Sequence, residues 1–305
     1  MNPVLAVLVL MSNSQGATSE PMSPYSLPIN NPKSISVNKG WNDNAGKKLD
    51  ANQVAAKMDS YSFAIFGESH DNTDHKTELG KVITALEKRG RNVVLGLEMF
   101  TWPSQMNLNP WTMGYWTEAE FIENANWKVE WGFDYSIYKP VFDVVKQNRI
   151  PMIALNSPRN WVKQARTQGY DSLPADVKAL VPPLDLSNKN HRMVFTSLMG
   201  GHGSEMDSQM DSFYTSQTFW DTAMAASAVR ASKNRPKNTI FIVLAGSGHA
   251  LYGQGIDYRI TQQTGQKVFT MIGIELEIPT KVSSTLGDVI LVTDEPLSRK
   301  SSDSK

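Results

Sequence analysis

The sequence predicts an α/β fold, with a mainly parallel sheet of five or six strands flanked by helices and an inserted helical cap. Short apolar runs rich in β-branched and aromatic residues, typical of buried strands, alternate with segments whose apolar residues recur at helical spacing. A strand, a helix and a second strand in succession form a crossover unit, which pairs its two strands in parallel. The chain has 305 residues, of which 40% are apolar, and can therefore bury the core of one large domain.

The first crossover unit begins with the apolar run 61–66, which stops at Gly67. In residues 74–89 apolar side chains lie three and four positions apart, and Gly90 follows, so this segment is predicted to be a helix. The next apolar run, 92–98, is then the second strand.

The same patterns predict the remaining elements. Helices are expected over 51–58, 138–148 and 256–263, and further strands over 151–156, 239–245, 267–274 and, at the edge of the sheet, 288–293. From residue 158 to about residue 234 the pattern is helical and contains no strand. We interpret this segment as a helical cap, inserted across the strand ends over about 157–236.

Both ends of the chain are expected to lie outside the α/β domain of residues 51–280. Residues 1–19 contain a short apolar stretch followed by small polar residues, which is typical of a secretory signal peptide, although no basic residue precedes the stretch. The alternative is an unstructured N-terminus of a cytosolic protein. Residues 20–50, rich in Pro, Ser and Asn, predict an irregular leader. Residues 281–305 predict the edge strand and a disordered tail.

The composition excludes several classes of function. The chain has no cysteine, which removes disulfides, thiolate metal sites, cysteine catalysis and the lipid attachment of a lipoprotein. Its 30 basic and 30 acidic residues balance, so nucleic acid is not the expected partner. No window of 18 apolar residues predicts a membrane-spanning helix.

Three predicted strands that are far apart in the sequence end in carboxylate or imidazole side chains. Because ligands of parallel sheets bind beyond the carboxyl ends of the strands, these side chains are expected to share one site: Glu68, His70, Glu98 and His249. They are suitable ligands for a divalent metal such as Zn, Mn or Co. Without a metal, His249 would act as a base oriented by Glu68, so in an enzyme these two residues would be catalytic. A single Glu or His at a strand end more often makes a structural hydrogen bond.

Other histidines and methionines are weaker candidates. His75 either joins the site or lies on the surface of the first helical turn, and His191 is expected at the surface of the cap. His202 lies between two glycines, which would let its ring approach a ligand closely. Methionines near His202, Met199 among them, would line an adaptable apolar pocket or simply pack in the core.

Tryptophans are concentrated between residues 100 and 137. This stretch holds five of the eight in the chain: Trp102, Trp111, Trp116, Trp127 and Trp131. They are interpreted as core residues under a loop excursion, with an aromatic wall for a flat ligand as the alternative.

Together these segments resemble the ChaN-type haem-binding uptake proteins of the Tiki and erythromycin-esterase-like superfamily. The resemblance covers roughly residues 55 to 275 and rests on the following motifs: Phe66-Gly67-Glu68-Ser69-His70-Asp71-Asn72 with His75, the strand end at Glu98, the segment 217–225, and Ala245-Gly246-Ser247-Gly248-His249. Thr73 and Lys76 depart from the family pattern, where a proline and a second histidine are usual. The family's lipid-attachment cysteine is absent, so a soluble periplasmic location is expected instead.

The resemblance implies a haem-binding protein of the bacterial envelope or periplasm that takes part in haem and iron uptake. Its implied partners are haem, an outer-membrane haem receptor, and a second copy of the chain in a haem-linked homodimer. The alternative, implied by other members of the superfamily, is a metal-dependent peptidase or esterase. The axial ligand of the haem iron stays open, and the candidates for haem contacts are His202, Tyr214, Tyr252, Tyr258 and Met199.

Overall fold

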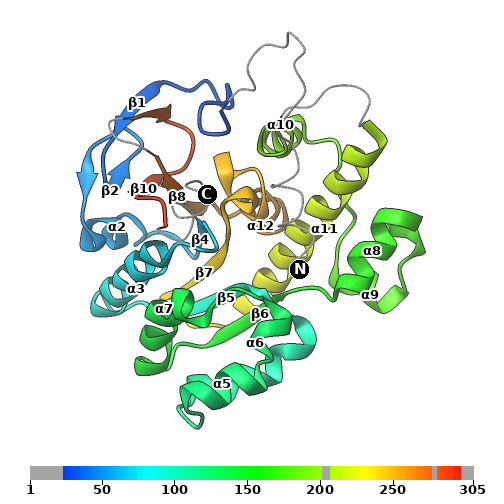
Figure 1. Cartoon of the computed structure of the whole chain (residues 1–305), viewed down its shortest axis with the longest axis horizontal. Coiled ribbons are helices and arrows are strands. Elements are labelled where there is room, and N and C mark those ends of the chain that lie inside the picture. Colours follow the sequence, from blue (N-terminus) through cyan, green and yellow to red (C-terminus); the bar gives the residue numbers. More distant parts are fainter. Residues whose placement is uncertain (1–22, 201–206, 277–279, 297–305) are drawn as a thin grey trace, which may run out of the picture.

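The computed structural model describes residues 23–200, 207–276 and 280–296, and its centre is an eight-stranded sheet (Figure 1). The strand order is β3-β2-β10-β8-β4-β7-β5-β6. The six strands from β10 to β6 are parallel, whereas β2 and β3 run antiparallel at one edge. The predicted α/β class with a mainly parallel sheet is confirmed. The predicted signal peptide and the end of the tail lie outside the described residues.

All six predicted strands are present, within a few residues of their expected limits. They are β4 (Phe63–Glu68), β5 (Asn92–Thr101), β6 (Met152–Asn156), β7 (Thr239–Gly246), β8 (Val268–Glu275) and β10 (Val289–Thr293). Except for a few terminal positions and Ile153, their residues are buried, as expected for strands covered on both faces.

The prediction of an irregular leader over 20–50 is wrong. This part of the chain forms β1 (Ser34–Val37), β2 (Gly40–Asp43) and β3 (Lys48–Leu49). β1 pairs with β9 (Thr280–Ser283) in a separate two-stranded sheet. β2 pairs with β10, so β10 is not the edge strand that the sequence suggested, because the leader covers its free side.

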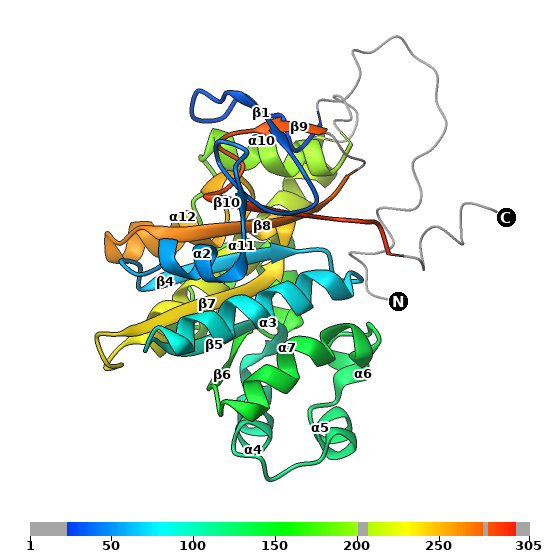
Figure 2. The same ribbon diagram turned by 90° about the vertical axis from the view of Figure 1, so that its left-hand side faces the viewer.

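Helices cover both faces of the sheet. α2 (Ala51–Lys57), α3 (Thr73–Lys88) and α7 (Tyr135–Gln147) lie on one face, and Figure 2 shows α3 running along the sheet with α7 beside it. α11 (Asp207–Ser232) and α12 (Ile256–Thr264) lie on the other face. A helical excursion after β5 contains η1 (Trp102–Asn107), α4 (Asn109–Thr112), α5 (Glu118–Asn124) and α6 (Trp127–Glu130).

Successive side chains along each strand point to opposite faces of the sheet, so the interior is divided into two cores. In β4, Ala64 and Phe66 pack toward α3, whereas Phe63 and Ile65 pack toward α11 and α12. The core beneath α3 and α7 also contains Trp111, Trp127 and Trp131, as the interpretation of the tryptophans as core residues predicts.

The segment between β6 and β7 is helical in its described part, as predicted. It contains α8 (Arg159–Gln168), η2 (Tyr170–Ser172), α9 (Ala175–Leu180), α10 (Lys189–Leu198) and α11. α11 packs against β6, β7 and α12, so it forms part of the layer on the sheet as well as the base of the cap (Figure 1). Within the described ranges, no helix has the length and apolar character needed to cross a membrane.

Candidate functional site

The carboxyl ends of β4, β5 and β7 bring the four predicted residues to one place, because these strands are neighbours in the parallel sheet. Glu68 pairs in register with Gly246, three residues before His249. Two further charged side chains complete the group. We call the strand-end cluster the six residues Glu68, His70, Lys76, Glu98, Asp221 and His249.

Glu68 is held on both of its carboxylate oxygens. Oε1 lies 2.7 Å from His70 Nδ1 and accepts a 3.0 Å hydrogen bond from the Tyr138 hydroxyl. Oε2 is paired with the ammonium group of Lys76, which also donates to the Ser69 carbonyl at 2.6 Å. The side chains of Glu68 and Lys76 are fully buried. This carboxylate is therefore a fixed anion that orients the ring of His70.

His249 lies between two carboxylates. Its Nε2 is 3.3 Å from Glu98 Oε1, and its Nδ1 is 2.5 Å from Asp221 Oδ1. The second oxygen of Glu98 accepts a 2.7 Å hydrogen bond from the backbone amide of Gly246. Gln217, on the same helix as Asp221, also contacts His249 Nδ1 at 2.9 Å.

Asp221 continues the network into the helical cap. Its Oδ2 lies 2.8 Å from His191 Nε2 and 3.6 Å from the Arg259 guanidinium. His191 Nδ1 in turn lies 3.0 Å from the Tyr214 hydroxyl. The expectation that His191 is a surface residue is wrong: only 1% of it is exposed, because α10 lays it against α11.

The charges in the cluster shift the pKa values of its members. Burial raises the pKa of Glu68, but Lys76 and His70 outweigh burial and bring it down to about 2. Burial lowers the pKa of His249, yet Glu98 and Asp221 outweigh it and raise the pKa to about 10. The cluster therefore holds an ionised Glu68 and a protonated His249 at neutral pH.

His70 is the member of the cluster that faces solvent most, with 25% of its side chain exposed. Its ring meets the edges of Trp131 and Phe133, at centroid distances of 4.6 and 5.4 Å. A Cβ atom at Gly246 would lie 2.8 Å from His70 Cε1, so only glycine leaves room for this ring. Trp131 is therefore a buried core residue that also packs against the ring of His70.

His75 does not join the cluster. It is fully buried, accepts a hydrogen bond from the Ser69 amide at 3.0 Å and contacts the Thr293 hydroxyl at 3.1 Å. Burial lowers its pKa to about 3, so it is neutral. Its role is to fix the turn between β4 and α3, which is neither of the positions that the sequence suggested.

Sequence reasoning missed two members of the cluster. Asp221 lies in the 217–225 segment, but a single Asp on a helix gives no sign of which strand end it will meet. Lys76 stood out only as a departure from the family pattern. A buried lysine four residues after a helix N-cap is the signal that could have revealed it, since lysine is almost never buried without a partner.

The predicted metal site does not fit the geometry. Among the residues that the structure describes, no group of three or more His, Asp or Glu side chains is placed to hold a metal ion. The carboxylate oxygens of Glu68 already face Lys76, His70 and Tyr138.

The comparison with protein families identifies the chain. A family model described as "Haem-binding uptake, Tiki superfamily, ChaN" matches residues 54–260. The chain belongs to the ChaN family. A comparison with curated proteins gave no match.

One solved structure agrees with the fold of this ChaN family member. It is similar to the protein of "Cofacial heme binding to ChaN of Campylobacter jejuni", with a TM-score of 0.65 and 18% identity over 84% of this chain and 98% of that one. Erythromycin esterase EreC in its open conformation is more distant, with a TM-score of 0.45 and 12% identity over 80% of this chain and 82% of that one.

The residues predicted to contact haem occupy different environments in this ChaN chain. Tyr214 is 1% exposed and bound to His191, and Tyr252 is 3% exposed, with its hydroxyl accepting from the Leu27 amide at 2.8 Å. Tyr258 is half-buried, and its hydroxyl donates to Asp185 at 3.0 Å. Met199 is half-buried at the end of α10, and His202 lies outside the described residues.

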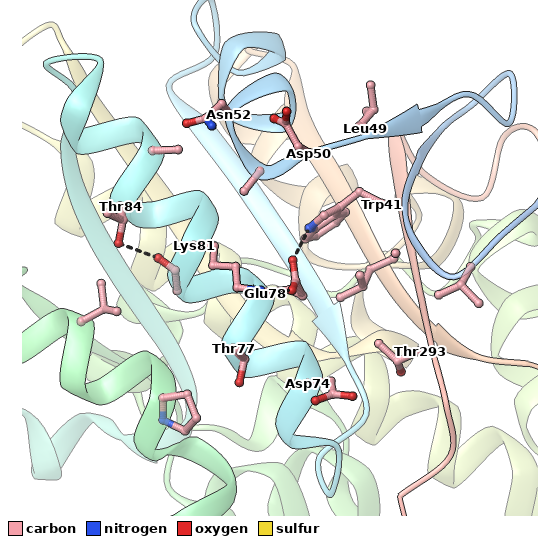
Figure 3. Close-up of a pocket in the computed structure, with 18 of the residues that line it drawn as sticks. Trp41, Leu49, Asp50, Asn52, Asp74, Thr77, Glu78, Lys81, Thr84 and Thr293 are labelled. Atoms are coloured by element: carbon pink, nitrogen blue, oxygen red, sulfur yellow. Dashed lines mark hydrogen bonds and ion pairs between the residues drawn. The ribbon is translucent and has the colours of Figure 1, made fainter.

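A hollow in the described part of this ChaN chain lies away from the strand-end cluster. It is a groove of about 860 Å³ along α3, with Trp41 and Glu78 hydrogen-bonded at 3.1 Å in its wall (Figure 3). Glu78 also binds Lys81. None of the groove's lining residues is His, Tyr or Met, the uncharged side chains that ligate haem iron. The residues that line the groove therefore include no axial ligand for a haem iron.

Proposed function

We propose that this chain binds haem and serves haem and iron uptake at the bacterial envelope. The observation that carries the proposal is membership of the ChaN family over residues 54–260. The related Campylobacter jejuni protein is described as binding haem cofacially, which supports a second copy of this chain as partner in a haem-linked dimer. A periplasmic location, export by a signal peptide and an outer-membrane receptor belong to the same proposal.

The face formed by α10 and the start of α11 fits a porphyrin best. A small apolar cluster of Phe195, Met210 and Tyr214 supports it, with Met199 and Phe213 packed against this cluster and partly exposed. Half-exposed aromatic and methionine side chains give an apolar, adaptable surface for a flat ligand.

Two ends of α10 offer different axial ligands. Met199 follows the end of the helix, whereas Tyr258 contacts Asp185 just before its start. Ten helical residues separate these ends by about 15 Å. One iron atom therefore cannot take ligands from both ends of the helix, and substitutions can distinguish them.

Titration of the purified full chain with hemin tests the proposal. We expect a Soret band that shifts and saturates at a fixed stoichiometry. Met199→Ala or Tyr258→Phe should alter the band, depending on which end supplies the ligand, and His202→Ala tests the ligand predicted from the sequence. Tyr115→Phe is the matched control, because Tyr115 is 74% exposed in the excursion after β5. A spectrum equal to that of hemin with an unrelated protein would refute haem binding.

Hydrolysis is the second candidate function, supported by the two imidazole–carboxylate pairs of the strand-end cluster. With a pKa raised to about 10, His249 would act as a general acid at neutral pH rather than as the base suggested by the sequence. His70, oriented by Glu68, is the exposed imidazole that could accept a proton. Turnover of chromogenic esters that is lost in His70→Ala but unaffected by a chelator would support this candidate.

A further inference from the structure

Lys76 is a fully buried lysine within the strand-end cluster. Its ammonium group contacts Glu68 Oε2, donates to the Ser69 carbonyl at 2.6 Å and lies 4.5 Å from the centroid of the Tyr138 ring. An ammonium group has three donors, and here each has a partner: a carboxylate, a carbonyl and an aromatic face. The side chain is thus held in place from three directions.

Both oxygens of Glu68 already have partners, which together use three of its roughly four lone-pair sites. Lys76 takes Oε2, while His70 Nδ1 and the Tyr138 hydroxyl share Oε1. A divalent metal would need at least one of these oxygens as a ligand. It would therefore either displace the buried ammonium group of Lys76, and breaking a buried ion pair is costly, or share Oε2 with it and lie beside a second positive charge.

We propose that Lys76 is the resident cation of the strand-end cluster, taking the electrostatic place of a divalent metal and excluding one from Glu68. Lys76 is then a positioning residue: it holds the Glu68 carboxylate in the orientation that fixes His70 Nδ1. The side chains of the strand-end cluster are held in position without a metal ion in this chain. This inference is independent of the proposed haem binding, because Lys76 lies on α3 and the proposed haem face is formed by α10 and α11.

Zinc titration of the haem-free full chain by calorimetry tests the inference. Lys76→Met keeps the length of the side chain and removes its charge, which opens Glu68 Oε2 beside His70. We expect Lys76→Met to gain one zinc site at Glu68 and His70, with water completing the coordination, at least tenfold tighter than any site of the wild type. The double variant Lys76→Met/Glu68→Gln should lose it. Lys81→Met is the matched control, because Lys81 is on the same helix with 58% of its side chain exposed.

Two outcomes would overturn the inference. One is a wild-type chain that binds stoichiometric zinc and loses it in Glu68→Gln, since Lys76 would then not exclude the metal. The other is a folded Lys76→Met that gains no zinc site. If Lys76→Met does not fold, Lys76→Gln replaces it, and the comparison of wild type with Glu68→Gln decides the first outcome without any lysine variant.

Discussion

Asp221 Oδ1 lies 2.5 Å from His249 Nδ1, although the two residues are 28 positions apart in the chain. This contact joins the long helix α11 to the end of β7. A carboxylate at Nδ1 fixes the tautomer of an imidazole and stabilises its protonated form. The inserted helices therefore do more than cover the sheet, because one of them sets the charge state of a strand-end histidine.

Asp221→Asn should lower the pKa of His249. Loss of the buried negative charge removes one of the two carboxylates that offset burial, so the pKa should fall by about 1 to 3 pH units. The titration of the His249 ring protons followed by NMR measures this change. Asp211→Asn is the control, since Asp211 lies on the same helix with 62% of its side chain exposed. A His249 pKa equal to that of the wild type would show that Glu98 alone sustains the charge.

Stability should fall as the pH rises from neutral toward 10. The pKa of His249 is about 10 in the folded chain and about 6.5 in an unfolded one, so the folded chain binds the extra proton. This contribution is complete below about pH 6.5 and is lost as the pH passes the folded value, with a size on the order of a few kcal/mol. Urea unfolding across this range measures it. In His249→Gln the free energy of unfolding should depend less steeply on pH over this range. An unchanged dependence would show that other groups cause the loss of stability.

The central sheet was predictable because parallel strands buried on both faces are continuous apolar runs, such as Thr239–Gly246. The antiparallel edge was not, because Gly40–Asp43 is short and half polar and becomes a strand only by pairing with β10. The same distinction holds in the site. Strand ends of one parallel sheet must meet, so Glu68 and His249 were predictable. Asp221 reaches His249 because α11 packs against the sheet. The spacing of residues in the sequence does not predict this packing.

His191→Ala should destabilise the fold, contrary to the expectation for a surface histidine. The substitution leaves a cavity between α10 and α11, and it removes the 3.0 Å contact with the Tyr214 hydroxyl and the 2.8 Å contact with Asp221 Oδ2. Losing a buried hydrogen bond costs about 1 kcal/mol and the cavity adds to this loss, so we expect a fall of about 1 to 3 kcal/mol in the free energy of unfolding. Urea unfolding at neutral pH measures the loss. The neighbouring Arg192→Ala, which removes a mainly exposed ion pair with Asp211, should cost well under half as much.

Asp257→Asn should stabilise the protein above neutral pH. Asp257 is 3% exposed, and its carboxylate accepts hydrogen bonds from the Thr270 hydroxyl at 2.8 Å and from the Tyr258 amide at 3.1 Å. Burial raises its pKa to about 7, against about 3.9 for an unfolded chain. The neutral carboxyl is thus favoured by folding. The neutral carboxyl of Asp257 contributes fully to the free energy of unfolding below about pH 3.9. This contribution is lost as the pH rises through 7, because the folded chain must then hold a buried charge.

An asparagine has nearly the same shape and no charge, and the Thr270 hydroxyl can rotate to accept from its amide. We therefore expect a gain on the order of 1 to 3 kcal/mol in the free energy of unfolding at pH 8, and little change near pH 4. Asp143→Asn is the control, because 51% of the Asp143 side chain is exposed. An Asp257→Asn variant that is less stable than the wild type at pH 8 would show that the ionised carboxylate stabilises this end of α12.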